Sequence, residues 1–135
     1  MNQIIIAFDV DDVVINLRDE WVRRYNKDFD DDLKPEEITD WKISQFVKEE
    51  AREKIYDYIK DPEIYTATIP IEGIIEVINC LKNNFRVIFI TADAYNDGKF
   101  LWLKRYGLLD SLDDYVVAHD KSIVNFEYLI DDKPD

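Results

Sequence analysis

Four apolar runs divide the chain, and polar or helical segments lie between them. The first two runs cover residues 3–9 and 85–91, and the two shorter ones cover residues 115–119 and 126–131. They are rich in β-branched and aromatic side chains, which is typical of strands that are buried on both faces of a parallel sheet. We therefore predict four strands at these positions.

Helical periodicity occupies two of the intervals between the strands. Apolar residues recur at helical spacing over residues 73–81, and a second helix follows the candidate N-cap Asp97 and stops at Gly107. Strands that alternate with helices predict an α/β fold with a parallel sheet and right-handed crossovers. The single cysteine, Cys80, falls in the first helix, where we expect a buried structural thiol.

The long interval between the first and second strands does not follow this alternation. Residues 17–69 hold no convincing strand. They contain helical segments over residues 17–27 and 44–60, and a shorter piece that begins at Pro35. A crossover between parallel strands needs only about a dozen residues, so most of this interval is an insertion.

We interpret this insertion as a second part of the molecule. Residues 1–16 and 70–135 are predicted to form the core domain, and residues 17–69 a small helical cap. Because the insertion directly follows the first strand, it would lie over the carboxyl end of that strand, where parallel sheets bind ligands. The alternative is a helical extension with no role in the site.

Composition limits the classes of protein that fit. With 135 residues, of which 47% are hydrophobic, the chain predicts one folded domain with a real core. A formal net charge of -13 argues against binding a nucleic-acid polymer, whose phosphates are usually held by a basic surface. No apolar run approaches the roughly 18 residues that a bilayer crossing needs, and the start of the chain lacks secretory-signal features. These features and the single cysteine favour a soluble, cytoplasmic protein.

Acidic residues gather around the ends of two predicted strands. Asp9, Asp11 and Asp12 lie at the end of the first strand, and Asp131 and Asp132 at the end of the fourth. Two carboxylates ~4 Å apart repel each other by ~4 kcal/mol at an effective dielectric constant of ~20, so a divalent cation is the simplest compensation. A hard cation with oxygen ligands, most naturally Mg²⁺, suits such a cluster.

The other two strands lead to residues that can bind phosphate. Thr91 ends the second strand, and Lys121 follows the third. Each feature alone has a structural explanation: aspartates that cap a turn, a strand-end hydroxyl bonded to the backbone, or a surface lysine. Together they suit a phosphoryl transfer in which Asp9 is the nucleophile and Asp11 the general acid and base. The hydroxyl, the ammonium and a cation would neutralise the phosphoryl oxygens.

These residues stand in four motifs, FDVDDVV, FITA, HDKS and LIDD, that resemble those of the haloacid dehalogenase (HAD) superfamily of phosphohydrolases. The resemblance implies a HAD-like Rossmannoid three-layer sandwich, with a mainly parallel sheet, a small helical cap after the first strand and an aspartyl-phosphate mechanism. It implies catalysis by Asp9 and Asp11 and phosphate contacts from Thr91, Ala92 and Lys121. It also implies a Mg²⁺ ion held by Asp9, Asp131, Asp132 and the backbone carbonyl of Asp11. Asp12 has none of these roles and is expected to shape the loop.

A closer similarity is to the 5′(3′)-deoxyribonucleotidases of the C type. It rests on the DDVV continuation of the first motif, the segment PEIYTATIPIEG, the pair Trp102-Leu103, an isolated Trp41 and the ending DKSIVNFEYLIDDKPD. The similarity implies a nucleoside monophosphate as the substrate. Aromatic side chains of the cap could then stack on the base, and we select Trp41 and Phe46 as candidates. The alternative is that these residues pack in the core of the cap.

Three functional hypotheses remain open at this point. The chain is a Mg²⁺-dependent phosphatase for (deoxy)nucleoside monophosphates, a HAD phosphatase for another small phosphate ester, or a catalytically idle HAD-like binding module. Relatives usually continue with a further strand after the fourth motif, whereas this sequence ends at Asp135. We therefore expect one edge of the fourth strand to be unpaired, and a second copy in a homodimer could cover it.

Overall fold

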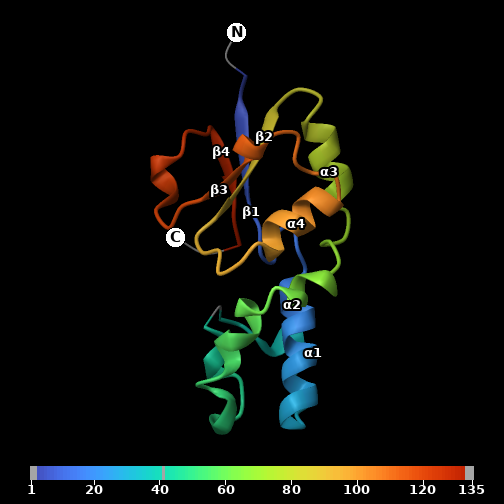
Figure 1. The fold of residues 1–135 in the computed structure, drawn as a ribbon, viewed down its shortest axis with the longest axis vertical. Coiled ribbons are helices and arrows are strands. Elements are labelled where there is room, and N and C mark those ends of the chain that lie inside the picture. Colours follow the sequence, from blue (N-terminus) through green and yellow to red (C-terminus); the bar gives the residue numbers. More distant parts are fainter. Residues whose placement is uncertain (1–2, 41, 133–135) are drawn as a thin grey trace.

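The computed structural model describes residues 3–40 and 42–132, with a sheet domain at one end of an elongated molecule and a cap at the other (Figure 1). The strands are β1 (Ile5–Asp9), β2 (Arg86–Thr91), β3 (Tyr115–Val117) and β4 (Tyr128–Ile130). They form one sheet in the order β3-β2-β1-β4, and every neighbouring pair is parallel. The predicted α/β fold with a parallel sheet is confirmed.

The register of the sheet brings the carboxyl ends of its strands to one edge. Asp9, the last residue of β1, lies opposite Ile90, which is one residue before the end of β2. On the other side, Phe8 lies opposite Ile130, the last residue of β4. The segments that follow these strands therefore leave the sheet side by side, and their polar residues can meet there.

The larger part of the core lies on one face of the sheet. The core domain also contains the helices α3 (Ile74–Leu81), α4 (Gly98–Arg105), η5 (Leu112–Asp114) and η6 (Lys121–Ile123), the last two being 3₁₀ helices. Both α3 and α4 cover the same face (Figure 1), where Phe8 and Phe89 belong to one buried cluster with Trp102. Because side chains alternate along a strand, Ala7 and Ile88 face the other side. There they form a smaller cluster with residues of the β3–β4 connection.

The prediction of a buried thiol at Cys80 is wrong, because this residue is exposed. Helix α3 buries one stripe of side chains, in which Ile78 is fully covered and Ile74 and Leu81 pack beside it. Successive residues on an α-helix are rotated by about 100°. Cys80 stands two positions after Ile78 and is therefore turned away from the sheet. Cysteine is a residue type that is often buried, but the position of Cys80 around the helix axis places it on the exposed side of α3.

Helix α4 begins and ends close to the predicted positions. Asp97 occupies the N-cap position, but its side chain makes no capping hydrogen bond. The side chain of Asn96 takes that role, because its Oδ1 accepts a hydrogen bond from the backbone N–H of Gly98 at 2.8 Å. At the other end, Gly107 has a φ of +69°, the left-handed conformation that commonly ends a helix.

The cap has a small hydrophobic core of its own. It contains the helices α1 (Leu17–Phe29), η1 (Pro35–Glu37), η2 (Ile43–Gln45), η3 (Glu49–Ala51), η4 (Ile55–Lys60) and α2 (Glu63–Thr66). Tyr25 of α1 is fully buried at the centre of this core. Among the described residues, none of the helices combines the length and the apolar character that crossing a membrane requires.

Residues 44–60 form short 3₁₀ turns rather than one continuous helix. The apolar residues Val47, Ala51 and Ile55 recur every four positions and do belong to the cap core, as their spacing predicts. However, the backbone N–H of Lys48 donates its hydrogen bond to the hydroxyl of Tyr25 at 2.8 Å. This contact takes the place of a helical hydrogen bond, so packing on α1 interrupts the helix.

Two connections that run side by side join the cap to the core domain. The backbone N–H of Asn16 donates to the carbonyl of Ile69 at 2.9 Å, and the N–H of Ile71 donates to the carbonyl of Val14 at 2.9 Å. These paired segments adjoin a cap whose residues form one hydrophobic cluster by themselves, while Leu17, Ile64 and Tyr65 of the cap pack in the core cluster. We propose that the paired segments mark the boundary between the core domain and a cap of residues 17–69.

Candidate active site

The chain turns sharply where it leaves β1, and this turn exposes two carboxylates to the same cavity. Asp12 has a φ of 61°, a left-handed conformation that aspartate tolerates better than most residues. Its Oδ1 accepts a hydrogen bond from the backbone N–H of Arg18 at 2.9 Å. Asp12 therefore shapes the turn, while the side chains of Asp9 and Asp11 line the cavity beside it.

Lys121 joins the two acidic segments that are far apart in the sequence. Its Nζ lies 3.2 Å from Asp9 Oδ1 and 3.0 Å from Asp131 Oδ2. All three side chains are largely shielded from water, with exposed fractions of 16%, 15% and 19%, respectively. The ends of β1 and β4 are thus held together by one ammonium group from η6.

The carboxylates of this cluster form an oxygen-rich group that fits a divalent cation. One carboxylate oxygen from each of Asp9, Asp131 and Asp132 lies within 4.8 Å of the other two. Burial, followed by the carboxyl groups of Asp132 and Asp131, raises the pKa of Asp9 to about 8, and Lys121 offsets this only in part. The cluster holds more negative charge than one lysine balances. Carboxylate oxygens are the ligands that Mg²⁺ prefers, so these residues fit that ion.

The end of β2 forms another wall of the same cavity. Thr91 is buried, and its Oγ1 donates a hydrogen bond to the carbonyl of Asp93 at 3.1 Å. Ala92 follows it and also lines the cavity. The structure therefore brings the predicted phosphate-binding residues Thr91, Ala92 and Lys121 to the cavity that holds Asp9 and Asp11.

Lys99 also belongs to this site, although the sequence motifs did not point to it. It stands in the first turn of α4, is only 8% exposed, and lies 2.7 Å from Asp11 Oδ2 through its Nζ. The positive end of the helix dipole disfavours a cation at this position. A lysine in the first turn of a helix that begins at the carboxyl edge of the sheet is the signal that could have identified it.

The cap closes the cavity from the side opposite the motifs. The cavity measures about 260 Å³. Its apolar and aromatic lining consists of Leu17 and Trp21 of α1, Ile59 of η4, Tyr65 of α2 and Tyr95. The hydroxyl of Tyr65 donates to Asp11 Oδ1 at 3.4 Å, so the cap contacts the predicted general acid directly.

Of the two predicted base contacts in the cap, only Phe46 can be placed relative to this cavity. Trp41 lies outside the described residues. Phe46 packs against the hydrophobic core of the cap and is absent from the cavity lining. The helical spacing of Phe46 fitted both a base contact and a residue of the cap core, and its packing in the structure corresponds to the cap core. Among the described residues, Trp21 is a cap tryptophan that lines the cavity.

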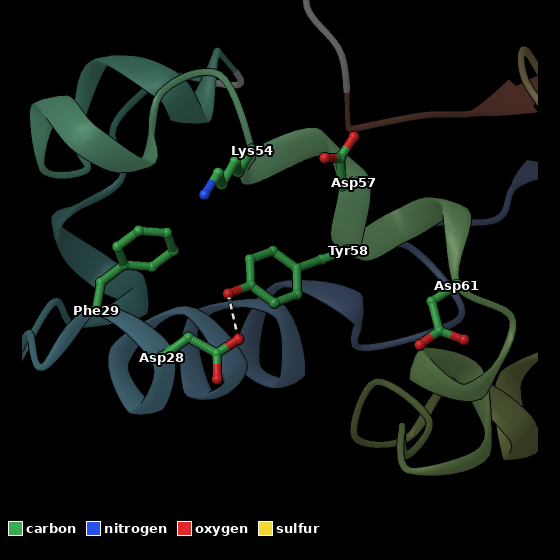
Figure 2. Close-up of a pocket in the computed structure, with 6 residues that line it drawn as sticks. All are labelled: Asp28, Phe29, Lys54, Asp57, Tyr58 and Asp61. Carbon is green, nitrogen blue, oxygen red and sulfur yellow. Dashed lines mark hydrogen bonds between the residues drawn. The ribbon is translucent and has the colours of Figure 1, made fainter.

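The cap contains a second cavity of about 390 Å³, shown in Figure 2. It is lined by Asp28, Phe29, Lys54, Asp57, Tyr58 and Asp61. The hydroxyl of Tyr58 donates to Asp28 Oδ2 at 2.5 Å across it. None of the motif residues lines this cavity, so the chemistry that the motifs predict belongs to the cavity between cap and core.

The sequence is similar to those of known 5′(3′)-deoxyribonucleotidases. Residues 2–135 match the family model for 5′-nucleotidase, deoxy (pyrimidine), cytosolic type C protein. A 5′(3′)-deoxyribonucleotidase from Clostridium acetobutylicum is 31% identical over 99% of this chain and 76% of its own length. One from Bacillus subtilis is 27% identical over 95% of this chain and 75% of its own length.

The fold is also found among solved structures. A HAD-superfamily hydrolase of subfamily IA from Geobacter sulfurreducens superposes with a TM-score of 0.53, at 16% identity, over 86% of this chain and 62% of that one. The predicted HAD-like fold is confirmed, as is the predicted enzyme class, a phosphoric monoester hydrolase. Because the family model spans nearly the whole sequence, the chain belongs to the family of 5′-nucleotidase, deoxy (pyrimidine), cytosolic type C proteins.

Proposed function

We propose that this chain is a Mg²⁺-dependent phosphatase that removes phosphate from deoxynucleoside monophosphates through an aspartyl-phosphate intermediate. The observation that carries the proposal is the convergence of Asp9, Asp11, Thr91 and Lys121 on one cavity under the cap. The substrate class is supported by family membership and by relatives that are named 5′(3′)-deoxyribonucleotidase.

In the first step, a carboxylate oxygen of Asp9 attacks the phosphorus atom of the ester. The bond between Asp9 and phosphorus forms while the bond from phosphorus to the ester oxygen breaks, and that oxygen takes a proton from the carboxyl group of Asp11. Burial raises the pKa of Asp11 even though the charge of Lys99 acts against it, and this favours the protonated form that the step requires.

In the second step, water attacks the phosphorus atom of the aspartyl-phosphate. The water gives a proton to Asp11, the bond from phosphorus to Asp9 breaks, and inorganic phosphate leaves with the Asp9 carboxylate restored. Lys121 and the hydroxyl of Thr91 would balance charge on the phosphoryl oxygens. When bound by Asp9, Asp131, Asp132 and the carbonyl of Asp11, Mg²⁺ supplies further positive charge to those oxygens.

The cap side of the cavity supports a substrate with a flat apolar group beyond its phosphate. Trp21 and Tyr95 offer aromatic surface, and Ile59 and Leu17 offer aliphatic surface. The acidic and basic groups lie on the core side, where the phosphate would bind. A nucleotide matches this division, because its phosphate and its base have these two characters.

A substrate panel tests the proposed function. Phosphate release is measured with Mg²⁺ for deoxynucleoside monophosphates, ribonucleoside monophosphates and sugar phosphates. We expect kcat/KM to be highest for the deoxynucleoside monophosphates. Turnover confined to non-nucleotide esters would favour a HAD phosphatase with another substrate. The absence of turnover on every monoester, with Mg²⁺ present, would leave a catalytically idle binding module.

The Trp21→Ala variant tests the base-binding wall. We expect kcat/KM for deoxynucleoside monophosphates to fall roughly 5- to 150-fold, since stacking on an aromatic side chain contributes about 1–3 kcal/mol per base. Deoxyribose 5-phosphate, which has the phosphate and sugar but no base, should lose little. The comparison of the two substrates is made on the same protein preparation by phosphate release.

Trp21→Phe is the matched control for this variant. The indole Nε1 of Trp21 donates to the carbonyl of Ile55 at 2.8 Å, so its removal also affects the cap itself. The phenylalanine variant lacks this hydrogen bond but keeps an aromatic face, and it should retain the preference for nucleotides. Equal losses on the nucleotide and on deoxyribose 5-phosphate would show that Trp21 does not contact the base.

A further inference from the structure

Lys99 is a buried lysine whose ammonium group is fully engaged. Its three N–H donors match three acceptors: Asp11 Oδ2 at 2.7 Å, Thr91 Oγ1 at 2.8 Å and the carbonyl of Asp93 at 2.8 Å. Lysine is almost never buried unless its charge is paired. Thr91 is the last residue of β2, and Asp11 and Asp93 lie in the segments that follow β1 and β2, so this side chain is directed to the site and not to the helix that carries it.

The location of Lys99 is unfavourable for a lysine with only a structural role. Burial removes water from the ammonium, and the first turn of α4 adds the positive end of a helix dipole. An apolar side chain at the same position would avoid both costs. The contacts with Asp11 and Thr91 offset them, which indicates that the function of this position lies in those two contacts.

The side chain of Asp11 is held from both sides by these neighbours. Lys99 donates to its Oδ2, and Tyr65 donates to its Oδ1 at 3.4 Å. The start of α4 is itself seated against Tyr65, because a Cβ atom at Gly98 would lie 2.5 Å from the Tyr65 ring. Lys99 and Tyr65 are therefore packed as one unit around the carboxyl group of Asp11.

We propose that Lys99 is a positioning residue that fixes the Asp11 carboxyl group relative to the phosphate-binding hydroxyl of Thr91. The inference rests on the proposed function, in which Asp11 transfers protons and Thr91 binds phosphate. One ammonium group contacts both side chains, so the proton donor and the phosphate site keep a constant separation. Lys99 lies 2.7 Å from Oδ2, whereas Tyr65 lies 3.4 Å from Oδ1, so Oδ1 is the less tightly held oxygen and gives its proton to the leaving alcohol.

The Lys99→Met variant tests this role through the leaving group. We compare kcat/KM for a deoxynucleoside monophosphate with that for p-nitrophenyl phosphate, since this constant reports the steps up to the first bond cleavage. An alcohol leaves only with a proton, whereas p-nitrophenolate leaves as a stable anion. A proton donor that moves by about 1 Å can lose about 10²-fold in rate, so we expect a loss of that order on the nucleotide and a much smaller one on p-nitrophenyl phosphate.

Lys104→Met is the matched control, because Lys104 is an exposed lysine on the same helix. It should leave both constants unchanged. A second check combines Lys99→Met with Asp11→Asn in one protein. We expect this double variant to have nearly the same kcat/KM for the nucleotide as Asp11→Asn alone, because residues that act as one unit do not have additive effects. If Lys99→Met does not remain folded, by circular dichroism and thermal unfolding, the same comparison is made with Lys99→Gln.

The outcomes separate this inference from the proposed function. Equal losses on both substrates by a folded Lys99 variant would overturn the positioning role and identify Lys99 as a phosphate contact or a stability residue. If the fold-loss in kcat/KM of the double variant equals the product of the fold-losses of the two single variants, the positioning role would be overturned as well. If the unmodified protein releases phosphate from neither substrate, the proposed function fails, and the positioning role fails with it.

Discussion

Replacing Asp9 by asparagine is expected to lower kcat on deoxynucleoside monophosphates by at least about 10³-fold, because loss of a covalent nucleophile removes the whole reaction path. The amide has nearly the shape of the carboxyl group but is a poor nucleophile. It also relieves the repulsion within the Asp9, Asp131 and Asp132 cluster, so the variant should fold at least as stably as the unmodified protein. Phosphate release and thermal unfolding measure the two effects separately.

Asp12→Asn is the matched control for this experiment. It makes the same change three positions away, and the asparagine side chain can still accept the hydrogen bond from Arg18. Asparagine also tolerates the left-handed backbone at this position. The control should keep most of the activity. An Asp9→Asn variant with activity close to that of the control would exclude Asp9 as the nucleophile.

Removal of divalent cations is expected to abolish turnover, and added Mg²⁺ is expected to restore it. A bound cation contributes several kcal/mol to stabilising a phosphoryl-transfer transition state, which corresponds to a rate loss of about 10³-fold or more when it is removed. Phosphate release is measured after dialysis against EDTA, and again after Mg²⁺ is added back. The apparent Mg²⁺ affinity should fall in Asp132→Asn, which removes one carboxylate of the cluster.

Thermal unfolding gives an independent measurement of the same site. Mg²⁺ that binds only the folded protein raises its stability in proportion to the logarithm of the ion concentration above Kd. We therefore expect a higher Tm with Mg²⁺ in the absence of substrate, and a smaller rise for Asp132→Asn. Full activity after EDTA treatment, with no effect of Mg²⁺ on Tm, would contradict the assignment of a metal site.

Local pattern was sufficient to predict the strands of the sheet, but not their lengths. The runs at 115–119 and 126–131 correspond to β3 and β4, which have three residues each. A strand ends where its neighbour no longer offers partners, and each of these strands pairs with only three residues of its neighbour. Hydrophobic pattern describes a segment by itself and contains no information on that overlap.

The cap was harder to predict because its elements depend on contacts between them. The periodicity of residues 44–60 matched the face that enters the core, but the hydroxyl of Tyr25 interrupts the backbone pattern from another helix. The same limit applies to Phe46, whose spacing suited either a base contact or the cap core. Packing against the partner segments decides between such alternatives, and no single segment encodes it.

The motif residues were predictable because their chemistry is tied to strand ends, which the sequence marks clearly. Asp9, Thr91 and Lys121 all lie at the carboxyl edge of the sheet, as the order of strands and helices predicts. Lys99 and Tyr65 are different. Each reaches Asp11 from a helix, across 88 and 54 positions of sequence, so only the packing of α4 and α2 brings them to the site.

The most direct test of the account is to ask which atom receives the phosphoryl group. The protein is mixed with a deoxynucleoside monophosphate and Mg²⁺, quenched in acid within the first turnover, and digested for peptide mass mapping. The account predicts one added phosphoryl group on the peptide that contains Asp9, and none in Asp9→Asn. Turnover by the unmodified protein with the phosphoryl group on another residue, or on none at any quench time, would contradict it.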